Sequence, residues 1–234
     1  MAYTHRSHER FQHYPDFVDE AERLEIQRAV NDMRNDWVPN VPPGEDEERI
    51  RKLAQMGFGF YTLGDAVYVL AKNKQGPEAV SPALREAMLD NFGWLYDKLL
   101  NKIDAITGVP SNLHPLTVPG FQISTVPFDF VMPYYHVDNS MLWYDERAKF
   151  ENIYSLVTVV DMSLSCGYLE YLDENDQGIV WPTRLNYEYG VLHTWSGTVP
   201  HRIGNFKVED GHQRLTFQAH MFYDPEENCN WVYF

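Results

Sequence analysis

The spacing of hydrophobic residues is helical in the first half of the chain and strand-like in the second half. Between Phe17 and Trp37, apolar side chains recur every three or four positions, at Ile26, Val30 and Met33. Residues at this spacing share one face of a helix, so the segment is expected to be an amphipathic helix.

Two shorter features are expected next along the chain. A charged helix is predicted over Glu45–Met56. Phe58–Leu63 and Ala66–Leu70 are predicted to form a hairpin, because the Gly64-Asp65 dipeptide between them suits a two-residue turn.

A long helix is expected after Ser81. The Ser81 hydroxyl can cap the first turn, and Pro82 is favoured there because the first helical amides have no intrahelical partner. Gly108 and Pro110 end the helix. The predicted buried stripe consists of Leu84, Met88, Leu95, Leu99, Ile103 and Ile106.

After Gly120 the apolar runs become short and rich in Val, Ile, Thr, Tyr and Phe, which is typical of strands. This density of strands predicts a double-sheet jelly roll, and the preceding helices are expected to brace one outer face of it. The predicted strands are Phe121–Val126, Phe128–His136, Ile153–Met162, Gly167–Leu172, Ile179–Trp181, Tyr187–Trp195 and Leu215–Tyr223.

The predicted fold class is therefore α+β, mainly β: a double-stranded β-helix (jelly roll) with N-terminal bracing helices. A single domain is expected over residues 1–234, because sandwich and barrel enzymes often have this length. Residues 1–15 are expected to be a flexible tail, 16–119 a mainly helical support with a hairpin, and 120–234 the jelly-roll catalytic core.

Composition narrows the expected partners to a small-molecule substrate. The chain carries 19 Lys and Arg against 34 Asp and Glu, a net charge of −15, which disfavours nucleic acid and anionic membranes. It has no apolar run of about 18 residues and no apolar signal core near residue 1, so a cytoplasmic location is expected. Two cysteines do not make a disulfide framework, and the oligomeric state is left open.

His136 and Asp138 end an apolar, aromatic strand. Residues i and i+2 of a strand point to the same side, so this imidazole and this carboxylate face the same space. A turn containing a hydrogen-bonded aspartate is the alternative. His201 follows Asp138 by 63 positions, and Arg214 and Thr216 come later on one face of a predicted strand.

The order His-x-Asp, distant His and Arg-x-Thr resembles the 2-oxoglutarate/Fe(II) dioxygenase superfamily over roughly residues 120–223. The resemblance implies that His136, Asp138 and His201 hold Fe(II). Two imidazoles and one carboxylate occupy one face of an octahedral iron and leave three positions for a bidentate 2-oxo acid and O₂.

The resemblance also implies a site for the far carboxylate of 2-oxoglutarate. Arg214 would bind it, because a guanidinium pairs with a carboxylate through two parallel hydrogen bonds, and Thr216 would add a hydroxyl donor. Tyr134 shares a predicted strand face with His136 and is a further candidate for binding 2-oxoglutarate. A core tyrosine with a satisfied hydroxyl is the alternative there.

The loop that follows Asp138 mixes aromatic and charged residues, as a substrate lid does. A small zwitterion needs both a cation and a carboxylate to hold it, so an amino acid or a close derivative is the expected substrate. A solvated loop is the alternative. The expected rim residues are Asn139, Trp143, Asp145, Arg147 and Trp231.

By this resemblance the expected reaction couples decarboxylation of 2-oxoglutarate to hydroxylation of a C–H bond. Relatives that halogenate carry Gly or Ala where this chain has Asp138, so halogenation is not expected. Two alternatives stay open: a cupin-like metal enzyme without 2-oxoglutarate, and a non-catalytic jelly-roll ligand-binding protein. The second has no use for Arg214 opposite a metal.

Overall fold

The computed structural model describes residues 11–40, 48, 52, 59–125, 134–162, 167–174, 178–204, 208 and 212–234. Within these residues the strands form a nine-stranded sheet and a three-stranded sheet. The larger sheet has the order β1 (Phe11–Tyr14), β9 (Leu192–Ser196), β6 (Ile153–Asp161), β11 (Arg214–Asp224), β5 (Gly120–Ser124), β3 (Phe60–Leu63) and β2 (Val38–Pro39), and β12 (Cys229–Tyr233) links β11 to β4 (Ser111–Leu113). The smaller sheet has the order β10 (His201–Ile203), β7 (Tyr168–Glu174) and β8 (Val180–Asn186).

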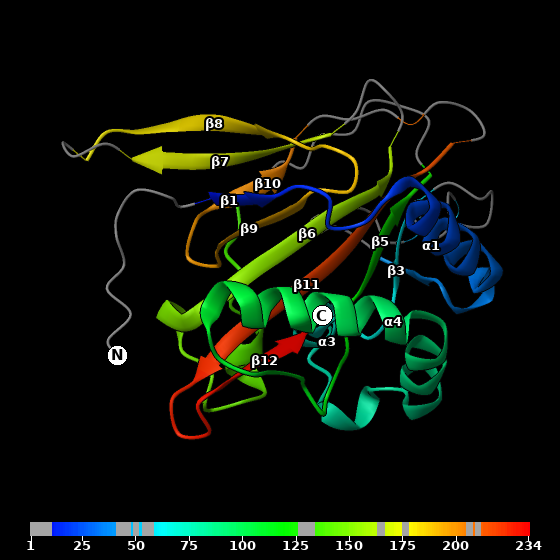
Figure 1. Ribbon diagram of the computed structural model, residues 1–234, viewed down its shortest axis with the longest axis horizontal. Helices are drawn as coiled ribbons and strands as arrows, with labels where there is room; N and C mark the ends of the chain where they lie inside the picture. Colours follow the sequence, from blue (N-terminus) through cyan, green and yellow to red (C-terminus); the bar gives the residue numbers. More distant parts are fainter. Residues whose placement is uncertain are drawn as a thin grey trace.

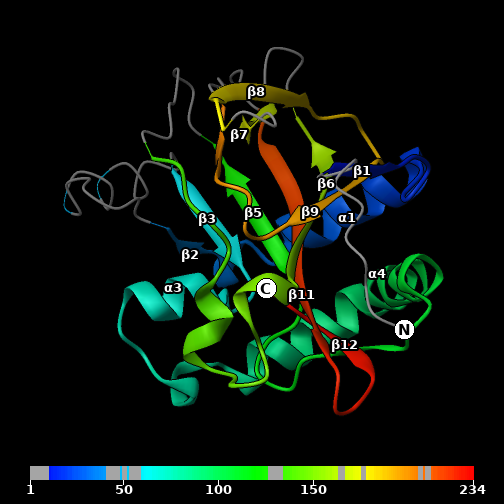
Figure 2. The ribbon, with the colours of Figure 1, turned by 90° about the vertical axis from the view of Figure 1, so that its left-hand side faces the viewer.

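Helices α1 (Glu20–Asp32) and α4 (Pro82–Thr107) lie on one side of the larger sheet, and the smaller sheet lies on the other (Figure 1). Figure 2 shows the larger sheet between β7 and β8 above and α4 below. The described residues include no helix with both the length and the apolar character needed to cross a membrane. The described helices are α1 (Glu20–Asp32), η1 (Arg34–Asp36), α3 (Val67–Lys72), η2 (Pro77–Ala79), α4 (Pro82–Thr107), η3 (Ser140–Trp143) and η4 (Phe150–Asn152).

Helix α4 confirms the prediction of a long helix after Ser81. The Ser81 hydroxyl accepts a hydrogen bond from the Leu84 amide at 3.2 Å, and Gly108 ends the helix in the left-handed conformation, with φ 73°. Leu84 and Ile106 of the predicted stripe are only half-buried. The buried face consists of Met88, Phe92, Leu95, Tyr96, Leu99 and Ile103.

Strand β11 shows why the larger sheet has two chemically different faces. Side chains alternate between the faces of a strand. Phe217 belongs to the apolar core under α4, and its ring stacks on that of Tyr96 with the centroids 6.2 Å apart. The alternate residues are polar and face the smaller sheet: Arg214, Thr216, Gln218 and His220.

A second apolar cluster fills part of the space between the sheets. Val157 and Val159 of β6 pack there with Leu169 of β7 and Trp195 of β9. Two sheets that share a core in this way form a sandwich, and helices cover its other face. The predicted fold class, a mainly β jelly roll braced by helices, is therefore confirmed.

Three details differ from the sequence-based expectations. Ala66–Leu70 does not form a hairpin strand: the chain enters α3 at Val67, because β3 already pairs with β5 on one side and β2 on the other. Phe11–Tyr14 is not a flexible tail, since it pairs with β9 as strand β1. Strands β4, β10 and β12 were not predicted at all.

Two further expectations fall largely outside the described residues. Of the charged helix predicted over Glu45–Met56, only Glu48 and Lys52 are described, and an ion pair of 2.8 Å joins them. Most of the predicted strand Phe128–His136 is likewise outside the described part of the chain.

Gly120 provides a test of how closely the chain packs at the start of β5. A Cβ at residue 120 would lie 2.3 Å from Phe234 Cδ1 and 2.5 Å from the backbone oxygen of Leu63. Gly120→Ala is therefore expected to lower the free energy of unfolding by about 1–3 kcal/mol in urea denaturation.

Gly93 is the matched control, because a Cβ there would meet no heavy atom of the described residues within 4 Å apart from its chain neighbours and the adjacent backbone of α4. Gly93 lies inside α4, so Gly93→Ala is expected to raise the free energy of unfolding by about 0.5–1 kcal/mol. A Gly120→Ala protein as stable as the wild type would contradict the close packing around Phe234.

Candidate metal centre

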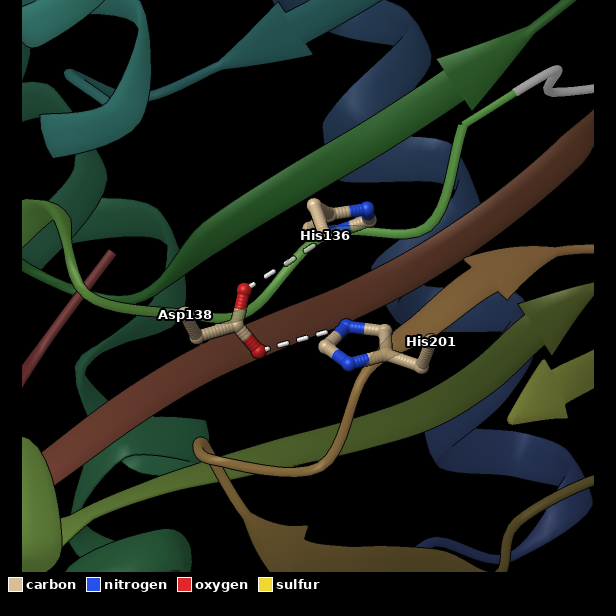
Figure 3. Close-up of side chains that lie close together, drawn as sticks. All are labelled: His136, Asp138 and His201. Atoms are coloured by element: carbon tan, nitrogen blue, oxygen red, sulfur yellow. Dashed lines mark ion pairs between the residues drawn. The ribbon is translucent and has the colours of Figure 1, made fainter. Parts of the chain in front are cut away.

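Three side chains from separate parts of the sequence converge between the two sheets: His136, Asp138 and His201 (Figure 3). One ligand atom of each lies within 4.8 Å of the others. His201 Nε2 is 3.3 Å from Asp138 Oδ2, and His136 Nε2 is 3.9 Å from Asp138 Oδ1. The two imidazole centroids are 4.4 Å apart. The expectation that these residues share one space is confirmed by this geometry.

Backbone hydrogen bonds bring the three residues together. The amide of His136 donates to the carbonyl of His201 and the amide of His201 donates back to that of His136, both at 2.9 Å. The Asp138 amide donates to the Gly197 carbonyl at 3.0 Å. The segment that carries two of the three side chains is therefore fixed against the start of β10.

The hydrogen bond made by His201 sets its tautomer. Its Nδ1 lies 2.8 Å from the carbonyl oxygen of Val199. A carbonyl can only accept, so Nδ1 carries a hydrogen and donates it to Val199, while Nε2 is the ring nitrogen directed at Asp138. Histidines that bind metals are commonly oriented in this way, with the second ring nitrogen donating to a backbone carbonyl.

Asp138 is held in its ionised form. Burial raises the pKa of its carboxyl, but His201, His220 and His136, together with a hydrogen bond donated by the Ser155 hydroxyl, outweigh that effect and lower the pKa to about 2. His220 Nδ1 lies 3.8 Å from Asp138 Oδ2. One carboxylate beside imidazole nitrogens is a donor set that suits a divalent transition metal.

The polar face of β11 continues away from this cluster. Arg214 is the largest fully buried side chain of the described residues, with 1% exposed, and Thr216 on the same face is 0% exposed. The guanidinium carbon of Arg214 lies 5.7 Å from the centroid of the Tyr187 ring. Burial raises the pKa of Tyr187 to about 12, with Arg214 lowering it and Asp138 raising it, so this tyrosine lies within the electrostatic reach of both residues.

No protein-family model matches this sequence, and no curated protein does either. The fold itself matches solved structures. An oxidoreductase of the 2OG-Fe(II) oxygenase family from Burkholderia pseudomallei has a TM-score of 0.52 at 11% identity, over 89% of this chain and 83% of that one. HygX from Streptomyces hygroscopicus, with nickel and 2-oxoglutarate bound, has a TM-score of 0.50 at 14% identity, over 90% and 82%.

A non-heme α-ketoglutarate-dependent epimerase from nogalamycin biosynthesis has a TM-score of 0.50 at 10% identity, over 91% of this chain and 78% of its own. The chain has the fold of the 2-oxoglutarate/Fe(II) oxygenases. At such identities the likeness concerns the fold alone. The resemblance that the His-x-Asp, His and Arg-x-Thr order suggests is therefore confirmed at the level of the fold.

Several residues around the centre were not predicted from the sequence or were predicted to have only a structural role. Ser155 bonds to Asp138 from β6, and His220 reaches the same carboxylate from β11. His220 shares a strand face with Arg214 because the two are an even number of residues apart. This spacing was the sequence signal that could have indicated its place. Tyr187 offered no signal, since its place depends on how the sheets stack.

Tyr68 is another residue that the sequence did not suggest. Its oxygen accepts hydrogen bonds from Asn40 Nδ2 at 2.9 Å and from Gln122 Nε2 at 3.1 Å. A phenol oxygen has two lone pairs and one hydrogen, so both lone pairs are engaged and the group acts toward any further partner as a donor. Its pKa is raised by burial and also by the charge of Asp138, which places it near the cluster.

Three of the candidate rim residues, Asp145, Arg147 and Trp231, lie together, but their charges are paired within the protein. Asp145 and Arg147 bind each other, with Nη2 2.6 Å from Oδ2, and Arg147 Nη1 lies 3.2 Å from Asp224 Oδ2. Arg147 also lies 5.1 Å over the Trp231 ring. These charges form a clamp, which corrects the expectation that they are free to hold a zwitterion.

The aromatic candidates of this region are mostly exposed. Tyr134 is 61% exposed and Trp143 is 80% exposed. An exposed Tyr134 is outside the buried polar face of β11, so its predicted contact with 2-oxoglutarate has no geometric support. Asn139 is half-buried directly before η3, beside Asp138 in the sequence.

The three-residue cluster predicts the metal-binding behaviour of single variants. His136→Ala, Asp138→Ala and His201→Ala should each weaken Mn(II) binding about tenfold or more, because each removes one donor from a three-donor site. The measurement is a titration in which electron paramagnetic resonance counts free Mn(II). The exposed His212 is the control, and His212→Ala should bind as the wild type does. A variant with unchanged affinity would remove its residue from the set of ligands.

The clamp predicts a stability change that depends on pH. Arg147→Ala would leave the carboxylates of Asp145 and Asp224 without their cation, although their side chains are only 9% and 1% exposed. The free energy of unfolding should fall by about 2–4 kcal/mol at pH 7, whereas Arg28→Ala on the exposed face of α1 should change little.

The sign of the pH dependence follows from the Asp145 carboxyl. Burial raises its pKa, but hydrogen bonds from Arg147 and His114 outweigh this and hold it below the usual range. A depressed pKa stabilises the fold above the unfolded value, near 4, and that contribution is lost as the pH falls below it. The difference between wild type and Arg147→Ala in urea denaturation should therefore shrink from pH 7 to pH 3. An equal difference at both pH values would contradict the ionic clamp.

Proposed function

We propose that this chain is an Fe(II)- and 2-oxoglutarate-dependent oxygenase that hydroxylates a C–H bond of a small polar metabolite. One observation carries the proposal. An ionised carboxylate and two imidazoles converge at one end of a polar strand face, and that same face carries a fully buried arginine. An apolar cluster fills part of the space between the sheets beside this polar face.

His136, Asp138 and His201 are the residues that would hold the iron. Their ligand atoms lie within 4.8 Å of one another, and the tautomer of His201 leaves Nε2 free to coordinate. The donor set of two imidazoles and one carboxylate fits Fe(II) with open positions for further ligands. When bound, the iron and 2-oxoglutarate together supply the activation of O₂ and the oxidising power.

Arg214 is the residue that would hold the far carboxylate of 2-oxoglutarate. A buried guanidinium is well suited to this role because its planar fork pairs with both oxygens of a carboxylate in a weakly screened environment. Thr216, on the same face, adds a hydroxyl donor, and Gln218 Nε2 donates to that hydroxyl oxygen at 3.3 Å. This hydrogen bond orients the Thr216 hydrogen away from Gln218.

The substrate is proposed to be a small polar metabolite, of which an amino acid or a derivative is the first class to test. Support comes from the donors near the centre, above all the Tyr68 hydroxyl, whose lone pairs are taken by Asn40 and Gln122. Such a donor suits a carbonyl or carboxylate oxygen. Asn139 and Trp143 are the remaining candidates for the rim, because they follow Asp138 within η3 or directly before it.

The experiment that tests the proposal is formation of succinate from 2-oxoglutarate by the purified protein with Fe(II) and air, with and without a panel of amino acids and derivatives. Succinate should form only when Fe(II), 2-oxoglutarate and O₂ are all present, and the right substrate class should raise its rate. Binding of metal with no succinate would instead support the cupin-like alternative. An acyl or terpenoid panel that stimulates turnover while amino acids do not would overturn the substrate class.

Arg214 gives a sharper prediction within the same assay. Arg214→Ala should raise the 2-oxoglutarate concentration needed for half-maximal turnover by an amount equivalent to about 2–4 kcal/mol, because a buried charged hydrogen bond is lost. Arg214→Lys should restore only part of this, since an ammonium does not reproduce the fork. The exposed Arg28 is the control. An unchanged requirement in Arg214→Ala would place the carboxylate elsewhere.

A further inference from the structure

The residues that adjoin the two histidines of the centre share a single carboxylate, that of Glu170. The Tyr135 hydroxyl donates to Glu170 Oε1 at 2.5 Å. Arg202 donates to the same oxygen through Nε at 2.8 Å and through Nη2 at 2.5 Å. The Arg202 guanidinium also lies 4.6 Å over the Tyr135 ring. Tyr135 precedes His136 and Arg202 follows His201, so one side chain is tied to both ligand-bearing segments.

Glu170 acts from the side opposite the metal centre. Successive residues of an extended chain point to opposite faces, and His136 and His201 face the cluster. Tyr135 and Arg202 therefore lie on the reverse face. There Glu170 of β7 is the register partner of Arg202 in β10. The carboxylate thus joins β7, β10 and the segment that carries His136.

Within the described residues, the backbone of the His136 segment has few other attachments. It forms an isolated bridge with His201 rather than a ladder, and in the described part of the chain its backbone is held by the two bonds of that bridge and by the bond from Asp138 to Gly197. The hydrogen bond from Tyr135 to Glu170 adds a further attachment one residue from His136. Only 11% of the Glu170 side chain is exposed, so water screens the charge-assisted bonds little.

We propose that Glu170 is a positioning residue, which holds the two histidines at the separation that the metal needs without touching the metal. The inference rests on the proposed function, because it takes the His-Asp-His cluster to be a metal centre. A site held in its binding geometry before the metal arrives binds more tightly, since less conformational freedom is lost on binding. A purely structural Glu170 would alter the stability of the fold and leave the metal affinity unchanged.

The test compares Mn(II) affinity with the stability of the metal-free protein. Mn(II) binding is followed by electron paramagnetic resonance of the free ion, and thermal unfolding is measured separately in EDTA. Glu170→Ala should weaken Mn(II) binding about 3- to 10-fold, less than the loss of a direct partner of a ligand. Glu170→Gln should weaken it less, because the amide oxygen still accepts from Tyr135.

Arg184 provides the matched control. Its Nε lies 3.9 Å from the other oxygen of Glu170, and 65% of its side chain is exposed, so it touches neither ligand-bearing segment through this contact. Arg184→Ala should bind Mn(II) as the wild type does. Tyr135→Phe keeps the ring beneath Arg202 and removes the bond to Glu170, so it should weaken Mn(II) binding even if Glu170→Ala fails to fold.

Weaker binding in Tyr135→Phe and Glu170→Ala, with an unchanged Arg184→Ala, supports the inference. Wild-type affinity in Tyr135→Phe or in a folded Glu170→Ala overturns it, as does a lower melting temperature in EDTA with unchanged affinity. An equal loss in Arg184→Ala overturns it too, because the effect would then be one of general charge. A wild-type protein that binds no Mn(II) overturns the proposed function, and this inference with it, and so is distinguishable from the other outcomes.

Discussion

The structure of the centre depends on one reciprocal pair of backbone hydrogen bonds. The amide of each of His136 and His201 donates a hydrogen bond of 2.9 Å to the carbonyl of the other. These two bonds bring together residues that are 65 positions apart in the sequence. Closing such a long loop costs conformational entropy that two hydrogen bonds alone do not offset. The bridge therefore relies on the sandwich around it, where the cluster of Val157, Leu169 and Trp195 holds the two sheets face to face. The fold thus positions the three side chains of the centre.

The period of two along β11 is the second constraint. Leu215, Phe217, Ala219 and Met221 must face α4 to bury the helix, so Arg214, Thr216, Gln218 and His220 are directed to the other side. Burial of so polar a row is costly unless each group has partners or a ligand. Strand β11 thus has a polar inner face and a well-packed apolar outer face. The apolar core on the outer face supplies the stability that the inner face lacks.

How far the sequence predicts this molecule depends on the range of the interactions. Local signals sufficed for α4, where Ser81, Pro82 and Gly108 mark the ends, and for His136 and Asp138, whose shared face follows from strand alternation. They failed where a distant segment decides. Gly64 does begin a turn, with φ 104°, but the hairpin cannot form because β2 and β5 already flank β3. Two ion pairs, Arg147–Asp224 and Arg202–Glu170, join segments that are far apart in the chain. No local sequence pattern near either arginine predicts them.

Those two arginines bear on the same stretch of chain. Tyr135 is tied to the carboxylate that binds Arg202, and ten residues later Asp145 is tied to Arg147, which reaches Asp224 of β11. His136, Asp138 and the helix η3 lie between these attachments. A segment that is held at one end by the Tyr135–Glu170 hydrogen bond and at the other by the Asp145–Arg147 ion pair keeps its middle in place without a ladder of backbone hydrogen bonds.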